Sequence, residues 1–146
     1  MPIYFYSSSQ TYFEFSNFSH DGIEMNGAWW PTVEHFFQAQ KFEDEAYRER
    51  IRRARGPKEA KTLGRTRALP ILPDWDAKRD EVMLAAIRKK FSTHATLREM
   101  LLGTGEEELV ENAPSDAYWG AGRSGTGQNK LGQILMRVRD ELRAKS

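Results

Sequence analysis

TVEHFFQAQK, at residues 32–41, is the stretch of sequence that decides the fold. In an α-helix each residue turns the chain by about 100° and adds about 1.5 Å along the axis. Glu34, Gln38 and Lys41, spaced i, i+4 and i+7, are therefore predicted to lie on one face of a helix. Phe36 points elsewhere and can anchor this helix in a hydrophobic core. The stretch thus predicts an amphipathic helix that presents a carboxylate, an amide and an amine together.

Two interpretations of this polar face are open. The rise from Glu34 to Lys41 is roughly 10 Å, which is long for a direct ion pair but lets two long side chains close on a small molecule between them. The alternative is a solvated polar face, which is the commoner arrangement on amphipathic helices. Spacing alone does not separate a binding site from such a face.

The composition limits the class of protein. The 146 residues suit one domain with a sizeable core, and we expect a single domain over residues 1–146. Lysine and arginine number 22 against 21 acidic residues, so the net charge of +1 predicts no general attraction to nucleic acid or membrane. The absence of cysteine excludes a disulfide framework, thiolate metal ligands and a cysteine nucleophile.

Location and cofactors can also be predicted. The amino-terminal sequence MPIYFYSSSQ lacks the basic region and long apolar run of a signal peptide, and no apolar stretch approaches the roughly 18 residues of a membrane span. We therefore expect a cytoplasmic protein without membrane association. His20, His35 and His94 show no metal-ligand spacing with acidic partners, so neither a metal ion nor another cofactor is expected. The oligomeric state is left open.

Short strands and several helices are expected along the chain. Asn26-Gly27 between two short apolar runs predicts a hairpin, because both turn residues must accept positive φ. Pro31 ends the second strand, and Thr32 can cap a helix that we expect to run to about Arg55. The other expected elements are strands at 3–6 and 109–110, and helices at 58–63, from Asp74 through the core positions Met83, Leu84, Ile87 and Phe91, at 93–102, and from Asn129 through Leu142.

Three polar or aromatic residues outside the first stretch are candidates for binding. Trp75 and Arg79 lie one turn apart at the start of a predicted helix. A ring beside a guanidinium can stack on a base or bind a phosphate, although a tryptophan packed in the core is the alternative. Asn17, within Ser16-Asn17-Phe18, could be a turn residue or an amide that points into a pocket.

A glycine-rich stretch precedes the last predicted helix. WGAGRSGTGQNKLG, at residues 119–132, holds five of the chain's eleven glycines, and Asn129 can cap the helix that follows. Such a loop lets backbone N–H groups approach an anion closely, and phosphate is the natural ligand. The spacing matches neither a P-loop nor a dinucleotide fingerprint. An anion site and a merely flexible loop remain alternatives.

Several segments carry a resemblance to a known family. They are FSNF at 15–18, WPTVEHFFQAQKF at 30–42, DW at 74–75, KF at 90–91, LLGTG at 101–105, DAYWGAG at 116–122 and GQNKLGQILMRVR at 127–139. Together they resemble the NADAR domain family, also called the YbiA-like family, and they cover nearly the whole chain. The resemblance implies a small, helix-rich α+β fold with a small antiparallel β element.

The resemblance also implies an activity and its residues. Members of the family are N-glycosidases that act on ribosylamine intermediates of the riboflavin pathway, on ADP-ribosylated guanine or on related nucleotides. By resemblance, Glu34 and Lys41 are the catalytic pair, and Asp116 and Trp119 complete the pocket. The residues expected to contact the substrate are Asn17, Gln38, Trp75, Arg79, Gly120, Arg123 and Asn129. Arg123 departs from the acidic or small residue expected there, which affects the specificity of the loop.

The expected chemistry follows from the lysine. A ribose on an exocyclic amine can open to an imine, so Lys41 can form a Schiff base with its C1 and release the heterocyclic amine. Lys41 must then be neutral part of the time, and neighbouring aromatic rings would favour this by excluding water. Glu34 or Asp116 would transfer the protons. Direct attack by water, with Lys41 as an electrostatic aid, is the alternative.

Three functions therefore compete. The first is an N-glycosidase for small phosphoribosylamino-pyrimidines. The second removes ADP-ribose from guanine in nucleic acid, and it predicts an open groove bordered by Arg52, Arg53, Arg65 and Arg67. The third is a module that binds ADP-ribose or a nucleotide without cleaving it, and the presence of both Glu34 and Lys41 disfavours it.

Overall fold

The computed structural model describes residues 1–145, which form two compact units. Unit 1 combines residues 1–19 with the segment that begins at Phe91, and unit 2 comprises residues 20–90. The boundary falls within one long helix, α4 (Trp75–Thr93). The expectation of a single domain stays a prediction.

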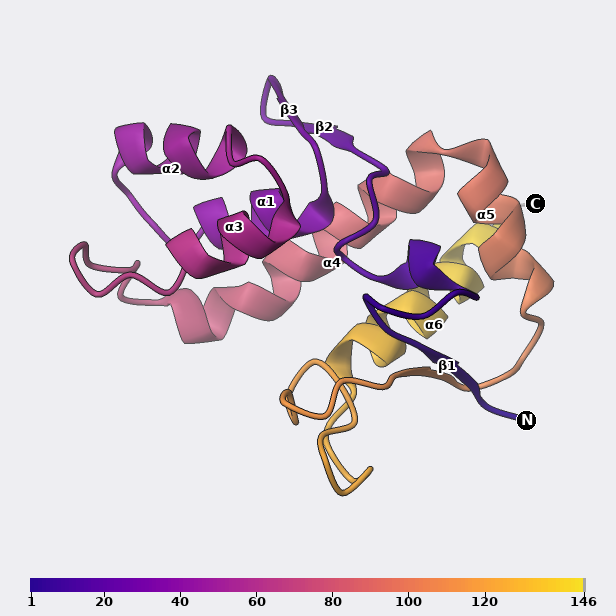
Figure 1. Ribbon diagram of the computed structural model, residues 1–146. Helices are drawn as coiled ribbons and strands as arrows, with labels where there is room; N and C mark the ends of the chain where they lie inside the picture. The colour runs from indigo at the N-terminus through magenta and orange to yellow at the C-terminus, as the bar shows by residue number, and fades with distance from the viewer. Residues whose placement is uncertain (146) are drawn as a thin grey trace. The chain divides into compact units, whose positions relative to one another are not determined.

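Unit 1 is built on a pair of parallel strands. β1 (Ile3–Phe5) pairs with β4 (Leu109–Glu111), with Ile3 opposite Leu109. The helix α6 (Lys130–Ala144) packs on β4 and on α5 (Ala95–Gly103) (Figure 1). A short 3-10 helix, η1 (Phe13–Phe15), contributes Phe15, whose ring lies edge-on to Phe5 at 5.8 Å. The core therefore joins chain ends that are far apart in the sequence.

Unit 2 begins with an antiparallel hairpin. β2 (Ile23–Met25) pairs with β3 (Ala28–Trp30), and the turn residues Asn26 and Gly27 have φ of 55° and 79°. The hairpin prediction is confirmed. The next helix, α1 (Val33–Ala39), packs against β3, α2 (Glu45–Arg52) and α3 (Pro57–Leu63) (Figure 1).

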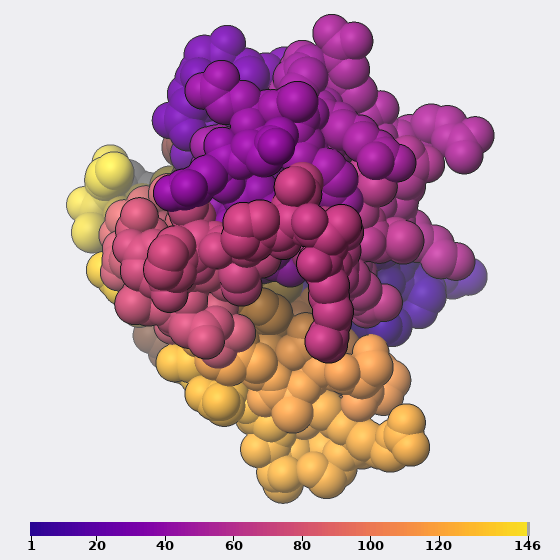
Figure 2. Space-filling view, turned by 90° about the vertical axis from the view of Figure 1, so that its left-hand side faces the viewer, coloured from indigo at the N-terminus to yellow at the C-terminus, as the bar shows by residue number. Residues whose placement is uncertain are grey.

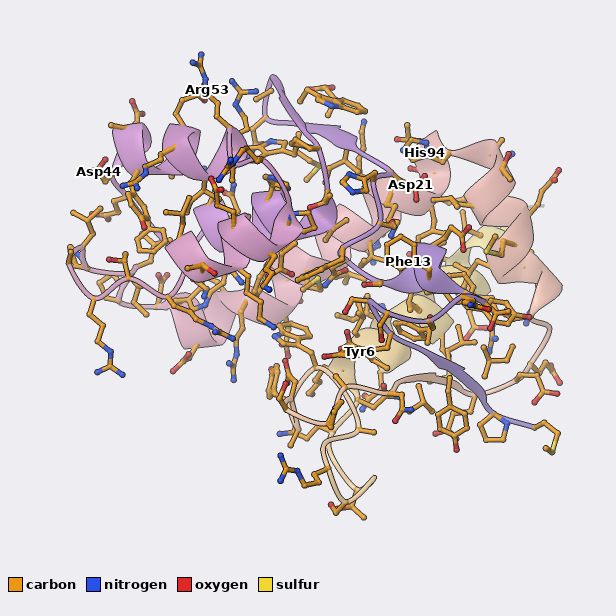
Figure 3. The ribbon with its side chains drawn as sticks, in the orientation of Figure 1. Tyr6, Phe13, Asp21, Asp44, Arg53 and His94 are labelled. Atoms are coloured by element: carbon orange, nitrogen blue, oxygen red, sulfur yellow. The ribbon has the colours of Figure 1, made fainter. Side chains whose placement is uncertain are left out.

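The prediction of one helix from Thr32 to about Arg55 is wrong. α1 ends at Ala39, and α2 begins only at Glu45. The amide of Lys41 bonds to the carbonyl of Gln38 (3.3 Å), an i to i+3 contact typical of a tightened last turn. Asp44 then starts a new helix because its carboxylate accepts from the Tyr47 N–H (2.8 Å). In Figure 3, Asp44 and Arg53 mark the two ends of α2.

The remaining elements agree with the sequence. The predicted strands β1 and β4 and the helices after Gly56, Asp74, Thr93 and Asn129 are all present. The core positions predicted for α4 are buried, including Met83, Ile87 and Phe91. Helices with a small antiparallel sheet confirm the α+β class, to which the structure adds the parallel pair of unit 1. Within residues 1–145, every helix is too short or too polar to cross a lipid bilayer.

Candidate functional site

The helix α1 buries its polar side chains. Glu34 is 7% exposed and Gln38 is 6% exposed, and the other residues of the helix are buried as well. Thr32 caps the first turn by accepting from the His35 N–H (3.1 Å), as predicted. Burying a carboxylate costs free energy unless it is hydrogen-bonded or paired. The interpretation of α1 as a helix with a solvated polar face is therefore wrong.

His35 fixes the position of α1 in unit 2. Its Nδ1 lies 2.7 Å from the Thr32 hydroxyl, and its Nε2 lies 3.0 Å from the carbonyl oxygen of Ala54. Because a carbonyl only accepts, Nε2 carries the proton and Nδ1 accepts from Thr32. Burial lowers the pKa of His35, more than the hydrogen bond to Ala54 raises it. A neutral imidazole therefore ties the start of α1 to the chain after α2.

Gln38 orients the buried carboxylate of Glu34. Its Nε2 donates to Oε2 of Glu34 at 2.6 Å, one helical turn away. Its Oε1 is buried and accepts no hydrogen bond from any of residues 1–145. Buried polar atoms without a partner are uncommon and often mark a site. The Gln38 amide thus holds one oxygen of Glu34 through its Nε2, and its Oε1 can still accept a hydrogen bond from a ligand.

Gly64 packs directly against this amide. A Cβ at Gly64 would lie only 2.0 Å from Oε1 and 2.7 Å from Cδ of Gln38, so any side chain would displace the amide. The carbonyl of Gly64 also accepts from Nζ of Lys41 at 3.3 Å. Gly64 directly follows the helix predicted at 58–63, and its contact with Gln38 could not be predicted, because only the fold brings residues 38 and 64 together.

Lys41 lies beyond α1 and not on its face. The helix ends at Ala39 with Gln40 as its C-cap, so the predicted i, i+4, i+7 stripe stops after Gln38. The backbone carbonyl of Lys41 accepts from the Leu72 N–H at 2.7 Å, and the neighbouring Phe42 pairs with Ile71. The loop after α3 therefore positions Lys41, which is half-buried.

The surroundings of Lys41 favour its neutral form. Burial lowers the pKa of the Lys41 amine, the Glu34 carboxylate partly opposes this, and the positive charges of Arg65 and Lys61 lower the pKa further. Desolvation and like charges both disfavour an ammonium ion. A lysine with a lowered pKa supplies more free amine at neutral pH, which is what nucleophilic attack requires.

A groove opens at Lys41. Its volume is about 380 Å³. We call it the Lys41 groove; it is lined by Lys41, Trp75 and the loop residues Gly64, Arg65, Thr66, Arg67, Leu69 and Ile71. Figure 2 faces the end of unit 2 that carries this loop and shows the loop at the molecular surface. Trp75 is 5% exposed and packs on Phe37 with ring centroids 5.1 Å apart, so it is a packed wall of the groove.

Unit 2 thus brings together four of the residues proposed from the sequence: Glu34, Gln38, Lys41 and Trp75. Arg79 lies half-buried on α4 and is not among the residues that line the Lys41 groove. The other proposed residues, which are Asn17, Asp116, Trp119, Gly120, Arg123 and Asn129, belong to unit 1.

Asp116 shapes the turn that carries Trp119. Its Oδ1 accepts from the N–H groups of Tyr118 (3.0 Å) and Trp119 (2.8 Å). The Trp119 ring lies edge-on to Tyr118, with centroids 4.9 Å apart. Asp116 and Trp119 are both half-buried, whereas Arg123 is exposed and Asn17 is 8% exposed. The roles of these residues in binding or catalysis stay predictions.

The glycine-rich loop uses its amides internally. The N–H groups of Asn129, Lys130 and Leu131 donate to the carbonyls of Gly120, Tyr118 and Trp119, at 3.0 Å in each case. These three helix-start amides are therefore not available to an anion, and an anion site elsewhere in the loop stays a prediction. The glycines allow backbone segments to approach, since a Cβ at Gly120 would lie 2.9 Å from the Glu111 carbonyl oxygen.

Asn129 also acts within unit 1. It occupies the N-cap position of α6 with φ of 51°, but its side chain makes no capping hydrogen bond. Instead the side-chain oxygen accepts from the Glu111 N–H (2.9 Å), and the side-chain amide donates to the Leu109 carbonyl (2.9 Å). The capping prediction is wrong for the side chain, because β4 holds the amide group.

No group of three or more potential metal ligands comes together in the part of the chain that the structure describes. The expectation that the protein uses no metal ion or other cofactor stays a prediction.

Comparisons with known proteins agree on one family. The family model of the NADAR domain matches residues 4–143. The N-glycosidase YbiA of Escherichia coli is 49% identical over 140 residues, which cover 96% of this chain and 88% of YbiA. The solved NMR structure of E. coli YbiA superposes with a TM-score of 0.91 at 48% identity, covering 99% of this chain and 86% of that one.

Two further relatives differ in length. An N-glycosidase of Nostoc punctiforme is 49% identical over 146 residues, which cover 98% of this chain and 94% of that protein. A protein of Vibrio vulnificus named as a riboflavin biosynthesis protein is 42% identical over 141 residues, which cover 97% of this chain but only 38% of the longer protein.

Proposed function

Because the chain belongs to the NADAR domain family, we propose that it is an N-glycosidase that hydrolyses the bond between a phosphoribose and an exocyclic amine. The prediction of an enzyme that acts on N-glycosyl bonds is confirmed by relatives of that name, which align over nearly the whole chain. The observation that carries the mechanism is Lys41, a half-buried amine with a lowered pKa in a groove.

The proposed substrate is an early phosphoribosylamino-pyrimidine of the riboflavin pathway. A relative named as a riboflavin biosynthesis protein contains a segment that is similar to this whole chain, which supports this class of substrate. Such a compound carries its ribose on an exocyclic nitrogen. The lone pair of that nitrogen can open the sugar ring to an imine, which leaves C1 electrophilic.

The proposed reaction has two halves. Nζ of Lys41 attacks C1 of the open-chain imine to form an aminal, and the heterocyclic amine leaves with its bonding electrons after taking a proton. The products of this half are the free heterocyclic amine and an imine between Lys41 and the sugar. Water then adds to this imine, and the adduct collapses to the sugar phosphate and the free lysine.

Glu34 is the proposed proton carrier. Its carboxylate is buried, and Gln38 holds Oε2 in place, so the other oxygen can face the reacting nitrogen without rotating away. A positioned acid or base of this kind contributes about 10²- to 10⁴-fold to the rate. By resemblance to the family, Asp116 and Trp119 are proposed as further site residues, and Asp116 is the alternative proton carrier.

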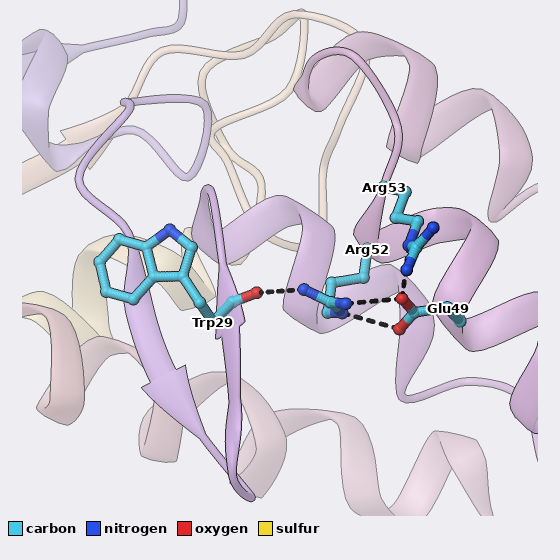
Figure 4. A network of polar contacts seen from close by, with 4 residues as sticks. All are labelled: Trp29, Glu49, Arg52 and Arg53. Carbon is cyan, nitrogen blue, oxygen red and sulfur yellow. Dashed lines mark hydrogen bonds and ion pairs between the residues drawn. The ribbon is translucent and has the colours of Figure 1, made fainter.

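A small-molecule substrate and a cytoplasmic location complete the proposal. Groups from unit 2 alone form a groove of about 380 Å³, which suits a small ligand. Removal of ADP-ribose from guanine predicted a border that includes Arg52 and Arg53. Both instead pair with Glu49 and lower its pKa to about 2, and Arg52 also donates to the Trp29 carbonyl (Figure 4). Arg65 and Arg67 do line the Lys41 groove, so half of that border is present, and the small-molecule substrate is preferred.

A trapping experiment tests the mechanism. The protein is incubated with a phosphoribosylamino-pyrimidine and borohydride, which reduces an imine to a stable amine, and the digested protein is analysed by mass spectrometry. We expect the reduced phosphosugar on the peptide that contains Lys41. Lys41→Ala should give no adduct, and Lys58→Ala, at an exposed lysine of α3, should be trapped like the wild type.

Two other outcomes are equally informative. A protein that releases the heterocyclic amine but is never trapped would favour direct attack by water, with Lys41 as an electrostatic aid. A protein that releases no amine from any ribosylated amine, while binding it, would exclude the N-glycosidase and favour a non-catalytic module.

A further inference from the structure

The arginines of unit 2 fall into two sets. Arg52 and Arg53 pair with Glu49, Arg55 pairs with Glu59, and Arg48 donates to Gln40. In contrast, across residues 1–145 the structure gives the side chains of Arg50, Arg65 and Arg67 no hydrogen bond and no ion pair. These three guanidinium groups are exposed and keep their N–H donors available, and such donors suit the recognition of a phosphate or carboxylate.

The unpaired set lines two adjoining grooves. Arg65 and Arg67 line the Lys41 groove, and Arg50 and Arg65 line a second groove of about 540 Å³ beside it. We call this second one the Tyr47 groove. The two grooves share Arg65, Thr66 and Leu69. A single extended ligand can therefore occupy both.

Tyr47 gives the second groove a fixed aromatic wall. Its hydroxyl donates to the Leu63 carbonyl at 2.6 Å, and Phe42 packs edge-on to its ring at 5.0 Å. The guanidinium of Arg50 lies over the ring, 5.8 Å from its centroid. A guanidinium held over an aromatic face keeps its outer N–H donors available.

Neither groove has an acidic residue among those that line it. The Lys41 groove is lined by three basic residues and the Tyr47 groove by two. Thr66 is a further hydroxyl donor in the latter, whereas the Thr62 hydroxyl donates to the Lys58 carbonyl at 3.0 Å. Phosphate is recognised by arginines together with hydroxyl and amide donors. The glycine-rich loop does not offer its helix-start amides for this task, because they bond to the loop's own carbonyls.

We propose that the Tyr47 groove is a second binding site, which takes the phosphate-bearing end of the substrate while the glycosidic carbon lies at Lys41. Arg50 and Arg65 provide the donors for the phosphate, and Thr66 provides a hydroxyl. This proposal rests on the proposed N-glycosidase, since it assigns one end of that substrate. It predicts an enzyme that prefers phosphorylated ribosylamines over their dephosphorylated forms.

Arg50→Gln tests the assignment by kinetics. Arg50 is preferred over Arg65 because the charge of Arg65 also acts on the pKa of Lys41. With the phosphorylated substrate, KM should rise by about 10- to 100-fold while kcat stays unchanged, since a hydrogen bond between charged groups is lost in both the ground and the transition state. With the dephosphorylated substrate, neither KM nor kcat should change.

Arg53→Gln is the matched control. Arg53 lies three residues along the chain from Arg50, is exposed, pairs with Glu49 and lines neither groove. It should leave KM for both substrates unchanged. An unchanged KM for the phosphorylated substrate in Arg50→Gln, or an equal rise for both substrates, would overturn the proposal.

A binding measurement separates the site from the chemistry. Inorganic pyrophosphate is titrated at millimolar concentration into the ¹⁵N-labelled protein, and the amide shifts of residues 62–69 are followed by NMR. We expect these shifts in the wild type and in Arg53→Gln, and smaller ones in Arg50→Gln. If they occur in a protein that cleaves no ribosylamine, the proposed function fails and the anion site stands. If the protein cleaves ribosylamines and the shifts are absent, the anion site fails and the function stands.

Discussion

The two stretches that the sequence marks for chemistry treat their polar groups in opposite ways. In unit 2, α1 buries Glu34 and Gln38, and Gln38 keeps an acceptor without a partner among the described residues. In unit 1, three successive N–H groups at the start of α6 donate hydrogen bonds to carbonyls of the glycine-rich loop that precedes the helix. A buried polar atom without a hydrogen-bond partner is tolerated where a ligand supplies the missing hydrogen bond. A network in which every polar atom has a partner within the protein mainly supports the fold.

This difference indicates that the α1 region carries reactive groups, whereas the glycines of the loop support the fold. The α1 region holds a carboxylate, an amide and a half-buried amine, and it adjoins a groove. The loop holds glycines at positions where two backbone segments nearly touch. Substitutions in the first region should therefore change the rate of reaction. Substitutions of the closely packed glycines in the second region should change the stability of the fold.

Removal of the Lys41 amine should have the largest effect. In Lys41→Ala, kcat/KM for release of the heterocyclic amine should fall by about 10³-fold or more, since both the nucleophile and its charge are lost. The release is followed by absorbance or by chromatography. Because Lys41 is half-buried and its pKa is lowered, its removal should not decrease the free energy of unfolding. A fall of less than tenfold in kcat/KM would show that Lys41 takes no direct part in the reaction, and would contradict the assignment of the reactive site to the α1 region.

Gly64→Ala should have the next largest effect. The new Cβ would displace the Gln38 amide, and with it the support of Glu34, while the carbonyl that receives Lys41 would shift. Misplacing reacting groups by about 1 Å can cost 10²-fold, so we expect kcat to fall by about 10²-fold. The displaced atoms belong to the end of a side chain, so the melting temperature should change much less than the rate.

Gly56→Ala is the matched control for Gly64→Ala. Gly56 and Gly64 cap the two ends of the same helix, α3, and a Cβ at Gly56 would meet no atom within 4 Å. Its φ of −164° is extended backbone that alanine adopts readily. It should leave kcat unchanged. Equal losses of kcat in both variants would show that α3, and not the contact with Gln38, is responsible.

Much of the fold, but less of the site, could be predicted from the sequence. The hairpin at Asn26-Gly27 and the helix after Gly56-Pro57 follow from local turn and capping chemistry, and both are present. The end of α1 was missed, because charged residues continue the helical pattern past Gln40. What ends the helix is the burial of Phe42 and its pairing with Ile71, which is a long-range contact.

The site shows the same division. Glu34, Gln38 and Lys41 could be proposed because they lie within one short stretch and carry reactive groups. Gly64 could not be proposed for the site, because its importance lies in the atoms it lacks and in a neighbour 26 positions away (64 against 38). The unpaired state of Arg50 was also hidden, since it stands among arginines that pair with Glu49.

Gly127→Ala tests the scaffolding half of the comparison. A Cβ at Gly127 would lie 2.7 Å from the Gly120 carbonyl oxygen and 2.8 Å from that of Ala117, so the backbone itself must shift. Overpacking of this kind costs about 1–3 kcal/mol in the free energy of unfolding, which denaturant titration measures. Gly103→Ala, where a Cβ meets nothing within 4 Å, should cause no loss. A loss of kcat in Gly127→Ala as large as that in Gly64→Ala would show that the loop also shapes the reaction.

The smallest expected effect is a shift in the pH dependence of kcat. If the free amine of Lys41 attacks, kcat rises with pH as the ammonium loses its proton, and burial together with Arg65 and Lys61 moves this rise to lower pH. In Arg65→Gln one repelling charge is removed, so the pKa of Lys41 rises and the limb of the profile moves to higher pH. At neutral pH kcat therefore decreases, and at high pH it returns to the wild-type value.

The same measurement distinguishes the two mechanisms. Arg67→Gln is the control, because Arg67 lines the Lys41 groove but is not among the charges that act on the pKa of Lys41. In direct attack by water aided by charged Lys41, protonated lysine is the active form, so the limb that belongs to Lys41 is a fall of kcat with rising pH. Its displacement to higher pH in Arg65→Gln would then extend activity at high pH. An increase in kcat at high pH in Arg65→Gln thus indicates that Lys41 acts as a cation. A decrease in kcat at neutral pH with no gain at high pH indicates that Lys41 reacts as a free amine.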